Sequence, residues 1–134
     1  MNYKAGGVTI IESAVKVLDE KDRDLIEALE AVGVRRNVAT IIVYLKDLDE
    51  ATSRDIERGS GLRQPEVSIA MNRLREKGWI AERNVKGTGK GRPTKLYRLI
   101  VPIEEIIGHY EEIKRSESAR AIETIQRLKE ISAT

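Results

Sequence analysis

The chain has 134 residues, of which 34% are charged and 40% hydrophobic, and its formal net charge is only +2. This length suits one domain, or one domain with a helical appendage. The absence of cysteine excludes disulfides, thiolate metal sites and cysteine nucleophiles. Apolar runs such as Ile41–Leu45 are too short to span a bilayer, and no signal peptide is apparent, so we expect a cytoplasmic protein with no membrane partner.

The N-terminal residues are expected to form a lead followed by a short helix. Residues 1–8 look irregular, and Thr9 and Glu12 have the spacing of a capping box, in which side chains and backbone donors satisfy each other at a helix start. Apolar residues then recur at helical spacing, which predicts an amphipathic helix over 10–19. A strand is the alternative there, because the sequence VTII is β-branched.

Two further helices are predicted in the next part of the chain. Asp22 can cap the first of them, and Gly33 is a suitable stop. The second is expected from about Asn37 to Leu48. It has apolar residues on more than one side, which indicates a central, buried helix.

The middle of the chain has the pattern of two helices joined by a tight turn. Thr52 or Ser53 can cap the first helix, and Gly61 lies in the turn. Pro65 is favourable in the first turn of the second helix, where its missing N–H needs no partner. Gly78 ends this second helix, whose core-facing stripe has apolar residues at spacings of three and four, namely Val67, Ala70, Met71 and Leu74.

A two-stranded hairpin is expected directly after that helix. Residues 79–81 open the first strand, and Lys95–Ile100 form the returning strand. The sequence NVKGTGKGRPT between them is too polar and too rich in glycine to pack. Trp79 is expected to fill the seam between the preceding helix and the hairpin.

The C-terminal stretch after Pro102 is predicted to be helical over 103–132, as one long helix or two in series. Its apolar stripe cannot stay in water without cost, because each buried Ile or Leu is worth roughly 1.5–3 kcal/mol. We therefore expect a homodimer, although the stripe could instead fold back on residues 8–18 of its own chain. The predicted dimer-interface residues are Ile106, Tyr110, Ile113, Ile125 and Leu128.

Positive charge is concentrated in the two-helix and hairpin region. Between Gly61 and Arg98 there are ten Lys and Arg residues against three Asp and Glu, a local charge of +7, so the rest of the chain sums to −5. Contacts with nucleic-acid phosphates require such a concentration. Double-stranded DNA is therefore the expected partner.

The second helix of the pair has the side chains that recognise bases. Residues that contact base edges in the major groove lie on the side of a helix away from its core stripe. Gln64, Asn72 and Arg73 suit adenine or guanine, and Ile69 can pack on a thymine methyl group. The alternative is an ordinary solvated helix face. The predicted DNA-binding residues, including those expected on phosphates, are Arg63, Gln64, Ser68, Ile69, Asn72, Arg73, Arg75, Lys86, Lys90, Arg92 and Lys95.

The hairpin tip over residues 84–94 carries part of this set. Its glycines allow close backbone approach, and Arg or Lys side chains are attracted to a narrow minor groove. The tripeptide Gly91-Arg92-Pro93 is similar to the core of an AT-hook, which favours a minor-groove or phosphate role for Arg92. A nucleotide-binding loop is not indicated, because GTGKGRPT lacks the Gly-Lys-Ser/Thr pattern and the following helix.

No catalytic or metal-binding pattern is apparent in the sequence. His109 is the single histidine, and beside Glu111 and Glu112 it gives no recognisable ligand spacing. No nucleophile–base pair or nucleophile motif appears. We therefore expect a protein that is not an enzyme and has no cofactor or metal.

These segments together resemble an archaeal winged helix-turn-helix transcriptional regulator, in the broad group with the TrmB, MarR and ArsR types. The resemblance rests on GVRRNVATIIVYLKDL, on TSRDIERGSGLRQPEVSIAMNRLREKGWI and on GRPTKLYRL. It implies a homodimer on a partly palindromic operator, with the helix around 64–77 in the major groove and the wing around 86–92 on the backbone or minor groove. The two recognition helices of such a dimer would lie about one DNA turn apart.

The sequence departs from each subgroup of that family. It lacks the large sugar-binding domain of full-length TrmB proteins and the cysteine and histidine clusters of metal-sensing ArsR proteins, and it identifies no effector. We expect a mainly α fold with a small β-hairpin wing, divided into an N-terminal lead and helix (1–23), a DNA-binding domain (24–101) and a C-terminal helical dimerisation segment (102–134). A sequence-specific transcriptional regulator is the leading hypothesis. An architectural chromatin protein that binds DNA non-specifically and a winged-helix protein-interaction module are the alternatives.

Overall fold

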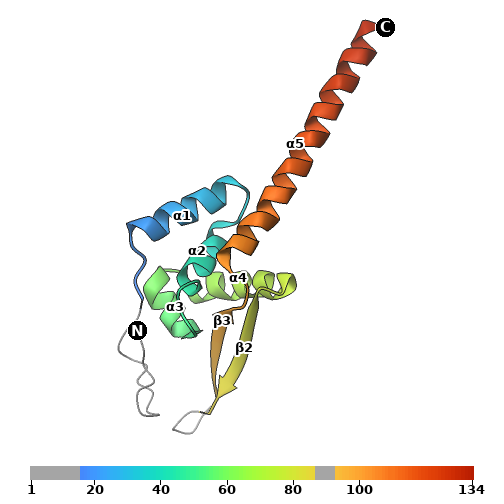
Figure 1. Cartoon of the computed structure of the whole chain (residues 1–134). Helices are drawn as coiled ribbons and strands as arrows, with labels where there is room; N and C mark the ends of the chain where they lie inside the picture. The colour runs from blue at the N-terminus through green and yellow to red at the C-terminus, as the bar shows by residue number, and fades with distance from the viewer. Residues whose placement is uncertain (1–15, 87–92) are drawn as a thin grey trace.

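Helices dominate the computed structural model, which describes residues 16–86 and 93–134 (Figure 1). A small antiparallel sheet completes the described part of the chain, so the expectation of a mainly α protein with a β-hairpin is confirmed at that level. The elements in chain order are α1 (Glu20–Ala31), α2 (Arg36–Leu45), β1 (Ala51–Thr52), α3 (Ser53–Ser60), α4 (Gln64–Lys77), β2 (Ile80–Val85), β3 (Thr94–Leu99) and α5 (Ile103–Ala133).

The beginning of α1 differs from the sequence expectation. Asp19 caps the helix, with its Oδ1 accepting from the Asp22 N–H at 2.8 Å, and Asp22 is the reciprocal partner rather than the cap. Because Asp19 has extended backbone angles, residues 16–19 enter α1 as irregular chain, and the predicted helix over 10–19 is wrong for these residues. Its first part, together with Thr9 and Glu12, lies outside the described residues.

Helix α2 is the centre of the core, as its apolar pattern predicts. Every residue from 38 to 45 is buried, and the Tyr44 hydroxyl donates to the Asp55 carbonyl of α3 at 3.1 Å. The helix ends at Leu45, three residues before the predicted end at Leu48. The other helices of the body are packed around this one element.

Local signals in the sequence correctly mark α3 and α4. Thr52 caps α3 in a capping box with Asp55, and α3 ends at Gly61, which has φ +80°. Pro65 lies in the first turn of α4, and α4 ends at Gly78, which has φ +73°. Both glycines adopt left-handed backbone angles that other residues rarely accept, so the tight turn and the helix end are specified locally.

The sheet has the strand order β1-β3-β2, and both pairings are antiparallel. The β2–β3 register places Glu82 opposite Tyr97 and Asn84 opposite Lys95. Strand β1 was not expected from the sequence. It is only two residues long, too short for an alternating pattern, and it pairs with β3 through Ala51 and Tyr97.

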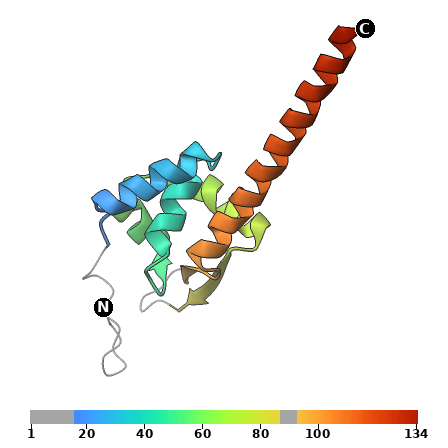
Figure 2. The same cartoon turned by 45° about the horizontal axis from the view of Figure 1, so that its top comes forward.

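Helix α5 is one continuous helix and projects away from the body, on the side opposite to the hairpin (Figures 1 and 2). Ile106 is fully buried in the core of its own chain, so the prediction that it belongs to a dimer interface is wrong. Tyr110 is half-buried, whereas Ile113, Ile125 and Leu128 are exposed. No helix within the described ranges is both long and apolar enough to cross a membrane.

Trp79 is buried, as expected, but its neighbours include residues that the sequence did not indicate. Its ring lies edge-on to His109 and Tyr110 of α5, at centroid distances of 5.2 and 6.1 Å. The Lys77 Nζ lies 5.4 Å from the centroid of the indole. Trp79 therefore joins the end of α4 to the base of α5, rather than filling only the seam between α4 and the hairpin.

Candidate nucleic-acid interface

Helix α4 has one buried and one exposed face. The four apolar residues of its predicted core stripe, Val67, Ala70, Met71 and Leu74, are buried. Five of the predicted DNA-binding residues on this helix are exposed, namely Gln64, Ser68, Ile69, Asn72 and Arg75. Arg63, which immediately precedes the helix, is also exposed. The helical period therefore separates core from surface as the sequence predicts.

A row of polar side chains follows the length of α4. The Gln64 Nε2 donates to the Ser68 Oγ at 2.9 Å, and the Arg75 Nη1 donates to the Asn72 Oδ1 at 2.5 Å. These residues lie on one side of the helix because they are three or four positions apart. Amide side chains can recognise adenine through two hydrogen bonds. The Asn72 amide oxygen already accepts one hydrogen bond from Arg75, and its second lone pair and its NH2 group remain for such a contact.

An ion-pair cluster connects this row to the hairpin. The Arg75 Nε and Nη2 donate to the Glu82 Oε1 at 3.1 and 3.0 Å, and the Lys95 Nζ lies 3.3 Å from the Glu82 Oε2. The hydrogen bond from Arg75 is the main cause that lowers the pKa of Glu82, and Lys95 adds to it. Glu82 therefore stays ionised and joins β2, β3 and the end of α4.

This cluster changes the expected role of two predicted phosphate contacts. Arg75 and Lys95 are both partly exposed, but each already has a carboxylate partner. Sequence reasoning missed Glu82, because only the β2–β3 register and the packing of α4 against β2 bring it to Arg75. The available signal was its position two residues after the buried Ile80, which puts it on the same side of the strand.

A second ion pair neutralises another cation of the hairpin. The Arg83 Nε and Nη2 donate to the two carboxylate oxygens of Glu50 at 2.6 and 2.7 Å. Hydrogen bonding to Glu50 raises the pKa of Arg83. Among the described basic residues between Gly61 and Arg98, three thus have carboxylate partners. Glu82 is already counted in the local charge of +7, so only Glu50, which lies outside this range, reduces that charge further.

Arg73 lies on the flank of α4 rather than on its outer face. The residue is half-buried, and its Nε is enclosed without a hydrogen-bond partner in the described part of the chain. An enclosed Nε limits how far the guanidinium group can reach. The position therefore suits base recognition less well than the exposed positions of Asn72 and Gln64.

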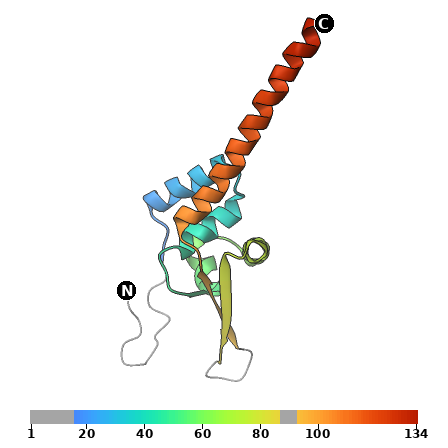
Figure 3. The same cartoon turned by 45° about the vertical axis from the view of Figure 1, so that its right-hand side comes forward.

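The hairpin carries the remaining predicted contacts. Lys86, at the end of β2, is exposed, and Lys95 is exposed on β3. Lys90 and Arg92 lie outside the described residues. In Figure 3, α4 is seen nearly end-on beside β2. The ion pair between Arg75 and Glu82 joins the polar row of the helix to the hairpin.

No group of three or more His, Asp or Glu residues in the described ranges is arranged to hold a metal ion. His109 is exposed and packs edge-on to Tyr110 at a centroid distance of 4.9 Å. No protein-family model matches the chain, and no curated protein matches it either.

Proposed function

We propose that the protein is a winged-helix, sequence-specific DNA-binding regulator of transcription that acts as a homodimer. In this proposal α3 and α4 form the helix-turn-helix, β2 and β3 form the wing, and α4 enters the major groove. The observation that carries the proposal is the exposed polar row of α4 beside a basic hairpin.

The dimensions of α4 support this role. Its 14 residues correspond to about 21 Å of helix, and an α-helix fits the major groove of B-DNA. Gln64, Ser68 and Asn72 present amide and hydroxyl groups to solvent along this length. Ile69, which is 50% exposed on the same helix, offers an apolar contact for a thymine methyl group.

The ion pairs favour sequence-specific binding over non-specific DNA packaging. A packaging protein derives its affinity from neutralising many phosphates. Here Arg75, Arg83 and Lys95 have carboxylate partners within the chain, which reduces the positive field at the surface. Exposed amide side chains, by contrast, serve no purpose in phosphate neutralisation.

The experiment that tests the function is selection of bound sequences from a random duplex library at about 150 mM salt, where non-specific binding is weak. We expect enrichment of an inverted repeat. DNA retention without an enriched motif would favour a chromatin protein. No retention would favour a protein-interaction module.

Substitutions on α4 and the hairpin give a sharper test of how DNA is recognised. Asn72→Ala should cost about 1–3 kcal/mol on the selected sequence and little on random DNA, because it removes a base contact. Lys86→Ala is the matched control and should weaken binding to both DNAs equally, because a phosphate contact carries no sequence information. Fluorescence anisotropy titrations with both duplexes measure the two effects. Equal losses from Asn72→Ala on both duplexes would contradict base recognition by α4.

A further inference from the structure

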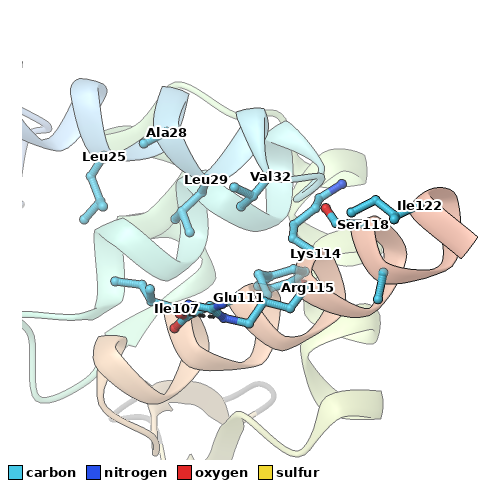
Figure 4. A pocket seen from close by; sticks show the side chains of 12 residues that line it. Leu25, Ala28, Leu29, Val32, Ile107, Glu111, Lys114, Arg115, Ser118 and Ile122 are labelled. Carbon is cyan, nitrogen blue, oxygen red and sulfur yellow. Dashed lines mark hydrogen bonds and ion pairs between the residues drawn. The ribbon is translucent and has the colours of Figure 1, made fainter.

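An apolar groove of about 820 Å³ separates α1 from the first half of α5 (Figure 4). Leu25, Leu29 and Val32 line it from α1, and Ile107 and Tyr110 line it from α5. Ile107 is 45% exposed within the groove. An apolar surface of this kind is typical of a site where another apolar segment binds.

The second half of α5 has the complementary property. Ile122, Ile125 and Leu128 are 61%, 51% and 59% exposed, although they lie on the same helix as the groove residues. This half of the helix extends away from α1 and from the rest of the described structure (Figures 1 and 2). Ile122 lies at the edge of the groove, whereas Ile125 and Leu128 lie beyond it. The chain thus has both an apolar groove and an apolar end of α5 that does not reach its own groove.

We propose that the groove binds the second half of α5 from another copy of this chain, with the two α5 helices antiparallel. This inference rests on the homodimer of the proposed function and specifies how its two chains meet. Ile107 then lies opposite Leu128 of the partner subunit, and Tyr110 lies opposite Ile125 of the partner subunit. The twofold axis passes near Ser118.

The positions of the apolar residues make this pairing self-complementary. Ile107 and Leu128 are equally far from the midpoint of residues 117 and 118, and so are Tyr110 and Ile125. One contact is therefore made twice across the twofold axis, as an isologous interface requires. Ser118 near the axis is small and lets the helices approach closely where they cross.

The position of Lys114 favours the antiparallel orientation over the parallel one. Lys114 lies on the same side of α5 as Ile107 and lines the groove. Parallel, in-register helices would place Lys114 against Lys114 of the partner subunit, and like charges at such positions are unfavourable. The antiparallel register places Lys114 opposite a small, uncharged Ala121 instead.

The orientation has a consequence for DNA. The hairpin and the second half of α5 point in opposite directions from the body (Figure 1). Antiparallel α5 helices therefore place the two hairpins at opposite ends of the dimer. The α5 helices would begin about 44 Å apart, given a rise of about 1.5 Å per residue. Half-sites should accordingly be separated by more than one DNA turn of about 34 Å.

Disulfide cross-linking of the full chain tests the orientation directly, because the native sequence has no cysteine. Three variants are required: Ser118→Cys, Ser132→Cys and the double variant Lys114→Cys with Ala121→Cys. Under mild oxidation we expect covalent dimers from Ser118→Cys and from the double variant. We expect none from Ser132→Cys, because antiparallel helices hold the two sulfur atoms about 44 Å apart, far beyond disulfide reach.

The single variants Lys114→Cys and Ala121→Cys are the matched controls. Neither should cross-link alone, because the axial separation of identical residues is about 10 Å in the antiparallel register. Efficient cross-linking of Ser132→Cys, or of either control, would establish parallel helices and overturn the proposal. Absence of cross-linking from every variant would place the interface elsewhere and overturn it as well.

Failure of the orientation can be distinguished from failure of the proposed function. Each cysteine variant is assayed in parallel, in reduced form, for binding to the selected DNA. A cross-link that establishes parallel helices, together with retained sequence-specific binding, would contradict only the antiparallel arrangement. If the native chain shows no sequence preference, sequence-specific DNA binding is contradicted, whatever the cross-links show.

Discussion

Glu82 holds two cations that the proposed function would place near DNA phosphates. Its carboxylate binds Arg75 and Lys95 at the junction of α4 and the hairpin. Glu82→Gln should release both side chains, so DNA affinity at low salt should rise. The slope of log K against log salt should become steeper by up to about two, which is about one for each released cation that contacts a phosphate. Anisotropy titrations over a series of salt concentrations measure this slope.

Glu76→Gln provides the matched control for that experiment. Glu76 is an exposed residue of the same helix, and its substitution removes the same charge without breaking the Arg75–Glu82–Lys95 cluster. It should change the salt slope less than Glu82→Gln does. Equal slopes for the two variants would show that Arg75 and Lys95 do not reach phosphate even when released.

Gly59 is required for close packing between α3, α2 and the chain before α1. A Cβ atom at this position would overlap the Lys16 carbonyl oxygen and the Tyr44 ring. Gly59→Ala should therefore lower the free energy of unfolding by about 1–3 kcal/mol, the usual cost of an overpacked core. Urea denaturation followed by circular dichroism measures the change.

Gly108→Ala is the control for the Gly59 substitution. Gly108 is also helical, but a Cβ atom there would have no neighbour within 4 Å. Alanine is favoured over glycine inside a helix by roughly 0.5–1 kcal/mol, so this variant should be slightly more stable than the native chain. A loss of stability at Gly108 similar to that at Gly59 would contradict the packing argument.

At the scale of elements, the predictable parts of the fold are those that local chemistry specifies. The Thr52 cap and the glycines at 61 and 78 mark α3 and α4 closely, because helix capping and left-handed backbone angles depend on a few adjacent residues. The same reasoning failed at residues 16–19. There Asp19 accepts the α1 capping bond and makes the preceding chain extended.

The candidate site was predictable only in part. Periodicity correctly separates the exposed row of α4 from its buried stripe, since both follow from the helical repeat. The ion pairs of Arg75 and Arg83 could not be predicted, because Glu82 and Glu50 reach them through sheet register and helix packing. Tertiary pairing of this kind leaves no fixed spacing in the sequence.

In the proposed dimer, the apolar residues of helix α5 have two roles, one in the core of the chain and one in the interface, and substitutions can separate these roles. Ile106→Ala should destabilise the fold by about 2–5 kcal/mol, because Ile106 is fully buried within its own chain. Ile125→Glu should leave the thermal unfolding of the body nearly unchanged and should convert dimers to monomers in light scattering. A dimer that survives Ile125→Glu would exclude the second half of α5 from the interface.

The burial of Ile106 also decides how the whole molecule can be shortened. Truncation after Pro102 would remove a core residue together with the partly buried Ile103 and Tyr110, so it would test stability as well as assembly. Full-length variants with substitutions on the exposed part of α5 test assembly without also changing the stability of the core. The body and the C-terminal helix therefore do not separate cleanly at the boundary expected from the sequence.

The exposed half of α5 has a consequence for how the whole molecule responds to its own concentration. Residues 123–133 are exposed and lie beyond the groove with α1, and isolated helices shorter than about 12–15 residues are only marginally stable in water. The end of α5 should therefore be partly unfolded in a monomer and should become helical when two chains meet. Circular dichroism at 222 nm should show helicity that rises with protein concentration, and Ile125→Glu should abolish that dependence. Assembly would then be coupled to folding, and a regulator of this kind would sense its own abundance through the order of one helix.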